Sequence, residues 1–175
     1  MLSVVHTAEL DRSTLAAARA LLVESFAGGF GDEDWEHALG GLHALALDGD
    51  RVVAHGAVVQ RRLIHGGRAL RAGYVEAVAV APTHRRQGYA AAVLQALEDV
   101  IGRAYDLGAL SATDDGAALY AARGWLRWQG PTSALTPTGT VRTPADDGGV
   151  FVLPGAAPVD PESALVCDWR DGDVW

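Results

Sequence analysis

The segment from Arg85 to Gly88, with the sequence Arg-Arg-Gln-Gly, has the residue types and spacing to bind an anion. It follows a short Val-rich stretch, residues 74–80, that suits a buried strand and is stopped by Pro82. It precedes a helical pattern, and the start of a helix presents unpaired N–H groups and the positive end of the helix dipole. The segment therefore predicts an anion site. The alternative is an Arg-capped strand-turn-helix unit such as any α/β protein contains.

Glu76 places a carboxylate inside that same Val-rich strand. Along an extended strand, four residues share one face: Tyr74, Glu76, Val78 and Val80. A carboxylate in apolar surroundings is costly unless it is paired or used in chemistry. Glu76 is therefore a candidate general base, and the alternative is a structural ion pair with Arg71 or another basic residue.

The length of 175 residues is that of one domain, 1–175, with enough chain to bury a core. No apolar run approaches the roughly 20 residues of a membrane span, and no secretory signal is visible, so we expect no membrane partner. The single cysteine, Cys167, excludes an intramolecular disulfide framework and fits a reducing compartment, which predicts a cytoplasmic protein. We expect Cys167 to be a small buried hydrophobic residue rather than a nucleophile.

Negative charge is concentrated at the end of the chain. Residues 143–175 carry seven acidic side chains against the single base Arg170, which is −6 of the net charge of −8. This distribution argues against a nucleic-acid partner and would attract a polycationic small molecule. Plain solubility is the alternative explanation.

The periodicity of apolar residues and the turn signals predict an alternation of strands and helices. Strands are expected at 4–10, 43–47, 52–60, 70–80, 107–111, 132–135 and 150–153, and a loop at 137–149. Helices are expected from Asp11 or Ser13 onward, at 32–39, after the Arg-Gly turn, and from Asp114 or Asp115 to Gly124. The first helix has a predicted core stripe of Leu15, Ala18, Leu22, Val23 and Phe26.

Two motifs in this order resemble the GNAT superfamily of N-acyltransferases: Arg85-x-x-Gly88-x-Ala90 after a Val-rich strand, and Leu119-Tyr120-x-x-x-Gly124-Trp125. The resemblance implies an α/β (α+β) fold, with a mixed, mostly antiparallel central sheet splayed at the acetyl-CoA site and flanked by helices. It implies that the coenzyme is held by the 85–90 segment, namely Arg85, Arg86, Gln87, Gly88, Tyr89 and Ala90, with N–H groups of 87–90 on the pyrophosphate. It also implies that Val78 and Val80 pair through their backbones with the pantetheine arm.

In such enzymes the tyrosine of the second motif often lies near the thioester sulfur, which makes Tyr120 a candidate general acid. The chemical reason is that a departing thiolate gains charge, which a phenol can stabilise by donating a hydrogen bond. The alternative is a core tyrosine whose hydroxyl group is satisfied by the protein.

A narrower resemblance, to the aminoglycoside 2'-N-acetyltransferase family, spans nearly the whole chain. It is carried by Asp34-Trp35-Glu36-His37-x-Leu39-Gly40-Gly41-Leu42-His43, Gln60-Arg61, Gly73-Tyr74-Val75-Glu76, Tyr105-x-Leu107-Gly108-x-Leu110-Ser111 and the ending Cys167-Asp168-Trp169-Arg170-Asp171-Gly172-Asp173-Val174-Trp175. It implies acetyl transfer from acetyl-CoA to the 2'-amine of aminoglycosides, with Glu76 as water-assisted base and Tyr120 as acid. The implied drug-site residues are Asp34, Ser111, Asp146, Asp173 and Trp175, the last through its terminal carboxylate. A homodimer is also implied.

One departure from the family concerns the segment after the first helix, where Gly28-Gly29-Phe30 replaces the usual Gly-Asp-Phe. It removes an acidic contact, which leaves open a GNAT enzyme acting on another cationic amine, such as a cell-wall amino sugar or a polyamine. A non-catalytic acetyl-CoA or antibiotic-binding protein is a third alternative, and the retention of both Glu76 and Tyr120 argues against it. The six histidines show no metal-ligand spacing, so we expect no metal.

Overall fold

The computed structural model describes residues 1–175, except for the side chain of Asp115. The chain forms two compact units: unit 1 contains Met1–Val59 and Val75–Val100, and unit 2 contains Gln60–Tyr74 and Ile101–Trp175. Two long strands, β3 (Arg51–His65) and β4 (Arg68–Val80), run through both units. None of the helices formed by the described residues has the length and apolar character needed to cross a membrane.

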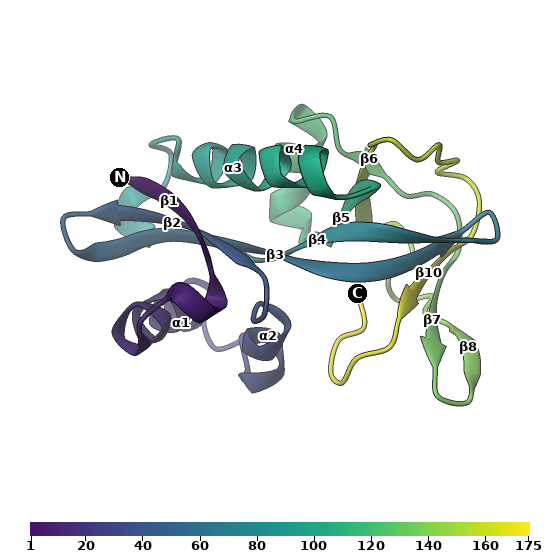
Figure 1. The fold of residues 1–175 in the computed structure, drawn as a ribbon, viewed down its shortest axis with the longest axis horizontal. Helices are drawn as coiled ribbons and strands as arrows, with labels where there is room; N and C mark the ends of the chain where they lie inside the picture. The colour runs from purple at the N-terminus through teal and green to yellow at the C-terminus, as the bar shows by residue number, and fades with distance from the viewer. The chain divides into compact units, whose positions relative to one another are not determined.

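Unit 1 is built on strands in the order β1-β2-β3-β4. β1 (Leu2–His6) pairs antiparallel with β2 (Leu42–Asp48), and β2 pairs antiparallel with β3. Helices α1 (Arg12–Ser25) and α2 (Asp32–His37) lie on one face of these strands, and α3 (Tyr89–Ala104) lies on the other (Figure 1). Two short 3-10 turns, η1 (Thr7–Glu9) and η2 (Pro82–His84), follow β1 and β4. The end of β4 is therefore joined to the start of α3 by η2 and a short turn.

The apolar stripe of α3 packs closely on the sheet. Val93, Leu94 and Leu97 are fully buried, as the helical spacing predicts. A Cβ atom at Gly56 of β3 would lie 2.8 Å from the Cγ1 atom of Val93. The strand therefore needs glycine at this point so that α3 can approach its backbone.

Helix α1 is capped by Asp11, whose side chain accepts a hydrogen bond from the N–H group of Thr14 at 2.7 Å. Its buried residues are Ala18, Leu21 and Leu22. The predicted stripe is wrong at Val23 and Phe26, whose side chains are exposed. At 100° per residue, Val23 points about 120° away from the face that Ala18 and Leu22 define, and Phe26 is the C-cap residue beyond the last helical residue, Ser25.

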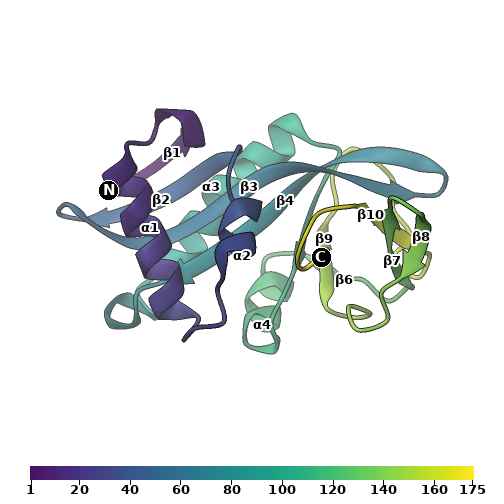
Figure 2. The ribbon, with the colours of Figure 1, turned by 90° about the horizontal axis from the view of Figure 1, so that it is seen from below.

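Unit 2 contains strands in the order β6-β9-β5-β4-β3-β10-β7-β8. Its elements after α3 are β5 (Leu107–Ser111), α4 (Asp114–Ala122), β6 (Leu126–Arg127), β7 (Thr132–Thr136), β8 (Gly139–Arg142), β9 (Val150–Leu153) and β10 (Leu165–Asp168). The pairs β4–β5 and β7–β10 are parallel, and the other pairs described are antiparallel. The hairpin of β7 and β8 extends beside β10 (Figure 2). The expectation of a mixed, mostly antiparallel sheet flanked by helices is thus confirmed.

The predicted order of elements is confirmed from β1 to α4, and β5 and β9 have the predicted bounds. The first strand ends earlier than predicted, at His6, because the side chains of His6 and Glu9 form a capping box that begins η1. The predicted loop at 137–149 is wrong in part, since it contains β8, and β6 and β10 were not expected. All residues of β6 and β8 are exposed, so neither strand has the apolar alternation that would reveal it.

Candidate active site

The predicted anion site is a turn in unit 1 that ends in the first turn of α3. Arg86 and Gly88 both adopt left-handed backbone conformations, with φ of 63° and 86°. The first helical hydrogen bond runs from Ala92 N to Gly88 O at 3.0 Å. Within the described chain, the N–H groups of Gln87, Gly88, Tyr89 and Ala90 therefore have no acceptor. Four unpaired donors at the positive end of a helix dipole, beside two arginines, suit a diphosphate.

Two side chains of the turn bond back to its own backbone. Arg85 Nε donates to the carbonyl group of Val80 at 3.4 Å, and the Gln87 amide donates to that of Thr83 at 3.1 Å. His84 lies 3.3 Å from an Asp48 carboxylate oxygen in the β2–β3 turn. These contacts fix the shape of the turn and leave its N–H groups and the exposed Arg86 side chain available to a ligand.

Strand β4 does not stay regular as it approaches this turn, because Ala77 has φ 52°, a left-handed value that is rare for a residue with a Cβ atom. The expectation that strict alternation places Glu76, Val78 and Val80 on one face is corrected accordingly, since alternation requires extended backbone at every residue. Glu76, Ala77 and Val78 are all half-buried. An irregularity of this kind re-aims the side chains next to it.

The ion-pair partner considered for Glu76 is engaged elsewhere. Arg71 donates its backbone N–H to Asp106 Oδ2 at 2.7 Å, and its guanidinium lies 3.5 Å from Asp106 Oδ1. The pKa of Asp106 is lowered chiefly by that backbone hydrogen bond. Arg71 and Asp106 thus form a pair of their own, which joins β4 to the residue before β5.

Tyr120 lies on α4 in unit 2 with its ring against Trp125 and Phe151, at centroid distances of 5.9 and 6.1 Å. Burial raises the pKa of Tyr120 to about 12, so the phenol keeps its proton at neutral pH. Its hydroxyl group has no hydrogen-bond partner among the described residues. A buried ring whose hydroxyl group keeps its proton and has no partner in the protein is the state that a general acid requires.

Most of the predicted drug-site residues belong to unit 2, where the tail after β10 comes close to the β8–β9 loop. The pKa of Asp146 is raised by burial and by the negative charge of Asp173, which places the two carboxylates in each other's field. Trp175 is buried, and its indole N–H donates to Thr143 Oγ1 at 2.9 Å. The backbone of Asp146 also bonds to Thr143, at 3.0 Å. Thr143 thus joins the tail to the loop.

Ser111 belongs to the same neighbourhood, because its hydroxyl oxygen lies 4.0 Å from the Cβ position of Gly149. The N–H group of Gly149 donates to the carbonyl group of Asp146 at 2.9 Å. Ser111, Asp146, Asp173 and Trp175 thus form a linked group in unit 2, which we call the acidic cluster. Two acidic groups near a free hydroxyl suit a cationic, polyhydroxylated ligand.

The tail is anchored by Arg61 and Arg170. Arg61 Nε donates to Asp168 Oδ1 at 2.8 Å, and Arg170 Nε donates to the carbonyl group of Asp173 at 2.7 Å. Both guanidinium groups lie over the ring of Tyr74, at 4.7 and 5.4 Å from its centroid. Cys167 is fully buried, as expected, and burial raises the pKa of its thiol to about 11.

Asp34 lies in unit 1, on α2, apart in sequence from the acidic cluster. Its Oδ2 atom accepts a hydrogen bond from Gly31 N at 2.7 Å and so caps the helix that carries it. One oxygen of this carboxylate therefore has a structural partner. This capping role of Asp34 adds to the drug-binding role that the family resemblance implies.

Sequence reasoning missed a pair of buried histidines in unit 1. His43 of β2 and His55 of β3 are fully buried, and their rings are hydrogen-bonded to each other at 2.9 Å. The available signal was a histidine in the middle of each of two apolar strands, because a buried polar group requires a partner. Metal-ligand spacing, which these histidines lack, does not reveal such a pair.

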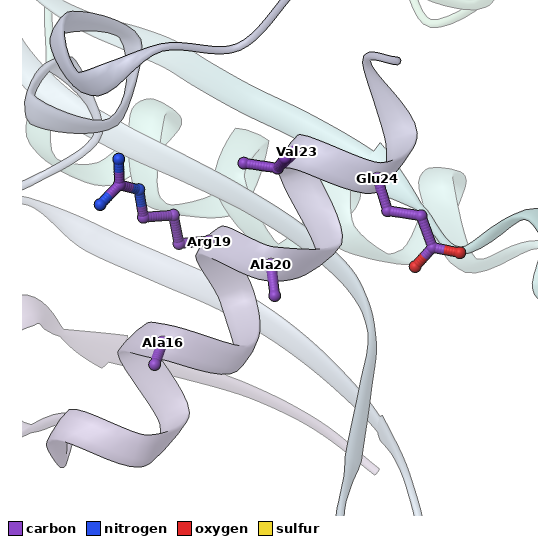
Figure 3. A pocket seen from close by; sticks show the side chains of 5 residues that line it. All are labelled: Ala16, Arg19, Ala20, Val23 and Glu24. Carbon is purple, nitrogen blue, oxygen red and sulfur yellow. The ribbon is translucent and has the colours of Figure 1, made fainter. Parts of the chain in front are cut away.

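A pocket also lies along one side of α1, lined by Ala16, Arg19, Ala20, Val23 and Glu24 (Figure 3). All five residues come from this one helix, and Arg19 forms an ion pair with Asp32. None of them is a predicted coenzyme or substrate residue. The pocket contributes nothing to the chemistry assigned to β4 and α3.

Comparison with known families identifies the class of protein. Residues 7–127 match the family described as an acetyltransferase (GNAT) domain. The solved structure of the GNAT N-acetyltransferase YhbS from Escherichia coli, in complex with CoA, is similar over 98% of this chain and 89% of its own, with a TM-score of 0.64 and 16% identity. Eis1 from Mycobacterium abscessus is similar over 76% of this chain and 33% of its own, with a TM-score of 0.61 and 20% identity. The chain belongs to the GNAT acetyltransferase family.

A relative defines the subgroup. The aminoglycoside 2'-N-acetyltransferase of Mycolicibacterium fortuitum is 54% identical over 176 aligned residues, which cover 98% of this chain and 90% of that protein. The chain therefore belongs to the aminoglycoside 2'-N-acetyltransferase family within the GNAT enzymes, as the sequence motifs indicated.

Proposed function

We propose that the protein transfers the acetyl group of acetyl-CoA to the 2'-amino group of aminoglycosides and thereby inactivates them. The observation that carries this proposal is the 54% identity, over 98% of the chain, to an aminoglycoside 2'-N-acetyltransferase. The acidic cluster supports it, because aminoglycosides carry several ammonium groups and many hydroxyl groups. The cytoplasm, where acetyl-CoA is available, is the proposed compartment, and a homodimer is the proposed assembly.

The coenzyme fits the turn before α3. Its diphosphate would accept hydrogen bonds from the N–H groups of 87–90, with Arg85 and Arg86 adding positive charge. The backbone of Val78 and Val80 would pair with the pantetheine arm. These assignments require backbone groups and no metal ion.

The reaction proceeds by direct attack. Glu76, through a water molecule, takes a proton from the 2'-ammonium group, and the free amine attacks the thioester carbonyl carbon. A carbon–nitrogen bond forms and the carbon–sulfur bond breaks, so the electron pair leaves with the sulfur. Tyr120 donates its proton to the thiolate. The second proton lost by the nitrogen passes to solvent, which later returns a proton to Tyr120. The net products are the acetamide, CoA thiol and one proton.

A second candidate function is acetylation of another cationic amine, and Gly29 is the observation that favours it. Gly29 lies in an exposed turn where its N–H group donates to the carbonyl group of Phe26 at 2.9 Å, and it presents no carboxylate. Specificity constants for aminoglycosides, amino sugars and polyamines would separate the two functions. Better turnover of a non-drug amine would favour the second.

The proposed function is tested by acetyl-CoA-dependent thiol release with two aminoglycosides that differ only at the 2' position, where one has an amine and the other a hydroxyl group. Release with the amine alone is the expected result. Release with both compounds would move the reaction to another nitrogen, and release with neither would remove the proposal.

A further inference from the structure

A chain of three hydrogen bonds crosses the interior of unit 1 and ends at the strand that carries Glu76. Thr7 Oγ1 lies 2.8 Å from His43 Nε2, His43 Nδ1 lies 2.9 Å from His55 Nε2, and His55 Nδ1 lies 2.8 Å from the carbonyl oxygen of Ala77. Both imidazoles are fully buried. The contacts run from η1 across β2 and β3 to β4.

The carbonyl group of Ala77, at the end of this row of hydrogen bonds, determines which ring nitrogen of each neutral histidine carries the proton. The carbonyl group of Ala77 can only accept, so His55 must carry its proton on Nδ1. In a neutral imidazole the Nε2 atom of His55 then accepts, which requires His43 to donate from Nδ1. His43 Nε2 is left to accept from the hydroxyl group of Thr7 at 2.8 Å, which is closer than the second acceptor of that hydroxyl group, the carbonyl oxygen of Gly41 at 3.2 Å. With both imidazoles neutral, His43 and His55 are therefore both in the Nδ1–H form.

The end point of the chain is the strained residue of β4. Ala77 has φ 52°, a strained conformation that persists only where its surroundings hold it. His55 supplies a side-chain donor to the Ala77 carbonyl group. The residue immediately before Ala77 is Glu76, whose backbone direction depends on this irregularity.

The histidine pair also contacts the helix that carries Asp34. The ring of Trp35, the next residue on α2, lies 6.3 Å from each imidazole, and the two imidazoles are 5.2 Å apart. The histidine pair thus contacts both the helix that carries Asp34, a proposed drug-binding residue, and the strand that carries Glu76, the proposed base. A change in the position of the imidazoles would therefore affect both α2 and β4.

We propose that His43 and His55 are positioning residues for acetyl transfer, which hold the Ala77 irregularity in one conformation and thereby aim the Glu76 carboxylate at the amine. This inference rests on the proposed function, because it takes Glu76 as the base. Its critical contact is the single hydrogen bond from His55 Nδ1 to the Ala77 carbonyl group. The His43 and Thr7 contacts fix the tautomer that makes this bond possible.

Burial accounts for the neutral state on which this assignment of the tautomers depends. Desolvation lowers the pKa of His43 and of His55 to about 4, and the charge of His6 adds to the effect on His43. The hydrogen bond to Ala77 acts in the opposite direction on His55 and is outweighed. Neither imidazole carries the second proton that would make it a cation at neutral pH.

Three substitutions of His55 separate positioning from packing. His55→Asn keeps a donor near the Nδ1 position, and His55→Gln places its amide near the Nε2 position, so only the first retains the bond to Ala77. His55→Leu removes both. We expect the single-turnover rate of acetyl transfer to stay near the wild-type rate in His55→Asn and to fall by about 10²-fold in His55→Gln and His55→Leu. The KM for acetyl-CoA should change little in all three.

The matched control is His65→Leu. His65 is also a buried histidine bonded to backbone, with Nδ1 3.1 Å from the carbonyl group of Ala164 and Nε2 accepting from Asp160 N at 3.0 Å, but it lies in unit 2. It should lose thermal stability as His55→Leu does and keep its transfer rate. Equal rates for His55→Asn and His55→Gln, or equal rate losses for His55→Leu and His65→Leu, would overturn the proposal.

A measurement without substrate separates this inference from the proposed function. Nitrogen-15 NMR of the imidazoles at pH 7 should show His43 and His55 as neutral Nδ1–H tautomers, and either one as Nε2–H would overturn the inference. If the wild-type protein acetylated no aminoglycoside, the proposed function would fail while the tautomers remained as expected. The rate comparison would then be made with whichever amine the enzyme accepts, and a wild-type rate in His55→Leu would again reject the inference.

Discussion

The segment Val75–Ala90 of unit 1 and the acidic cluster of unit 2 are built in opposite ways. The first is continuous in sequence, and its proposed ligands are mostly backbone N–H groups at the start of α3. The second collects side chains from β5, the β8–β9 loop and the tail after β10, joined by hydrogen bonds to Thr143 and by the mutual field of two carboxylates. Backbone donors recognise a diphosphate through geometry, and carboxylates recognise ammonium groups through charge.

This difference predicts that the two substrates can be affected separately. Substitutions in the turn before α3 should change acetyl-CoA parameters, and those in the acidic cluster should change aminoglycoside parameters. Substitutions of Glu76 and Tyr120 should change the rate of the chemical step and leave both KM values unchanged. A variant that altered both KM values together would break the comparison.

The largest effect is expected for Glu76→Gln, which removes the proposed base. Turnover should fall by about 10²- to 10⁴-fold, with the greatest loss at low pH, where the amine is most fully protonated. Acetyl-CoA affinity, measured by calorimetry, should stay at the wild-type value. Glu24→Gln on the exposed side of α1 is the control. A collapse of coenzyme affinity in Glu76→Gln would make Glu76 a structural residue.

Tyr120→Phe should slow transfer by about 10²-fold, because the thiolate would leave without a proton donor. Since the pKa of Tyr120 is raised to about 12, its ionisation should cause no loss of wild-type rate between pH 7 and about 10. Stopped-flow thiol release across this pH range measures both effects. Tyr105→Phe removes the hydroxyl group of a half-buried tyrosine and should have no effect on the rate. An unchanged rate in Tyr120→Phe would show that the thiolate leaves unaided.

The contrast between the two regions also explains what the sequence could predict. The strand, turn and helix around Arg85–Gly88 are contiguous, so apolar periodicity and glycine spacing identify them directly. The neighbourhood of Asp146 and Asp173 depends on how β7, β8 and β10 pair, and the shortest of the C-terminal strands leave no periodic signal. Those two residues were named through family resemblance alone.

Local backbone strain was beyond the reach of pattern reasoning. Nothing in the sequence Tyr74-Val-Glu-Ala-Val marks Ala77 as left-handed, because an alanine in a strand normally indicates extended backbone. The carbonyl oxygen of Ala77 lies 2.8 Å from Nδ1 of His55, a histidine 22 positions away in the chain. A buried histidine indicates that a partner exists, and only the fold identifies that partner as the Ala77 carbonyl group.

Asp173→Asn should raise the KM for the aminoglycoside by about 10-fold, the loss expected for one charge-assisted hydrogen bond, and leave the KM for acetyl-CoA unchanged. It should also lower the pKa of Asp146 towards its ordinary value, because the Asp173 charge helps to raise it. Steady-state kinetics and carboxylate NMR test the two effects. Glu162→Gln removes the same charge from an exposed position in the tail-proximal region. An equal KM increase in that control would show that Asp173 acts through its negative charge at a distance and makes no direct contact with the drug.

Gly88→Ala should raise the KM for acetyl-CoA several-fold, since a side chain at φ 86° costs about 1 kcal/mol and moves the N–H groups that follow. The aminoglycoside KM should not change. Gly102→Ala is a control inside α3, where a Cβ atom meets nothing within 4 Å, and it should stabilise the protein by about 0.5–1 kcal/mol. Weaker drug binding in Gly88→Ala with normal coenzyme kinetics would contradict the assignment of this turn.

The last expected effect concerns stability as a function of pH. Below pH 6.5 the unfolded chain protonates His43 and His55, and the folded protein excludes those protons until about pH 4. The contribution of the two neutral histidines to the free energy of unfolding should therefore be complete above pH 6.5. It should be lost as the pH falls from 6.5 to about 4. Calorimetric melting between pH 7 and 5 should show a shallower decrease in His55→Asn, which lacks one of the two groups. Parallel curves for the two proteins would contradict this.

The position of the new amide bond tests the central claim most directly. Wild-type protein would be incubated with acetyl-CoA and an aminoglycoside that carries several amines, and the product would be analysed by two-dimensional NMR. The account predicts a single acetyl group on the 2' nitrogen. Acetylation of any other nitrogen would contradict the assignment of the protein as a 2'-N-acetyltransferase.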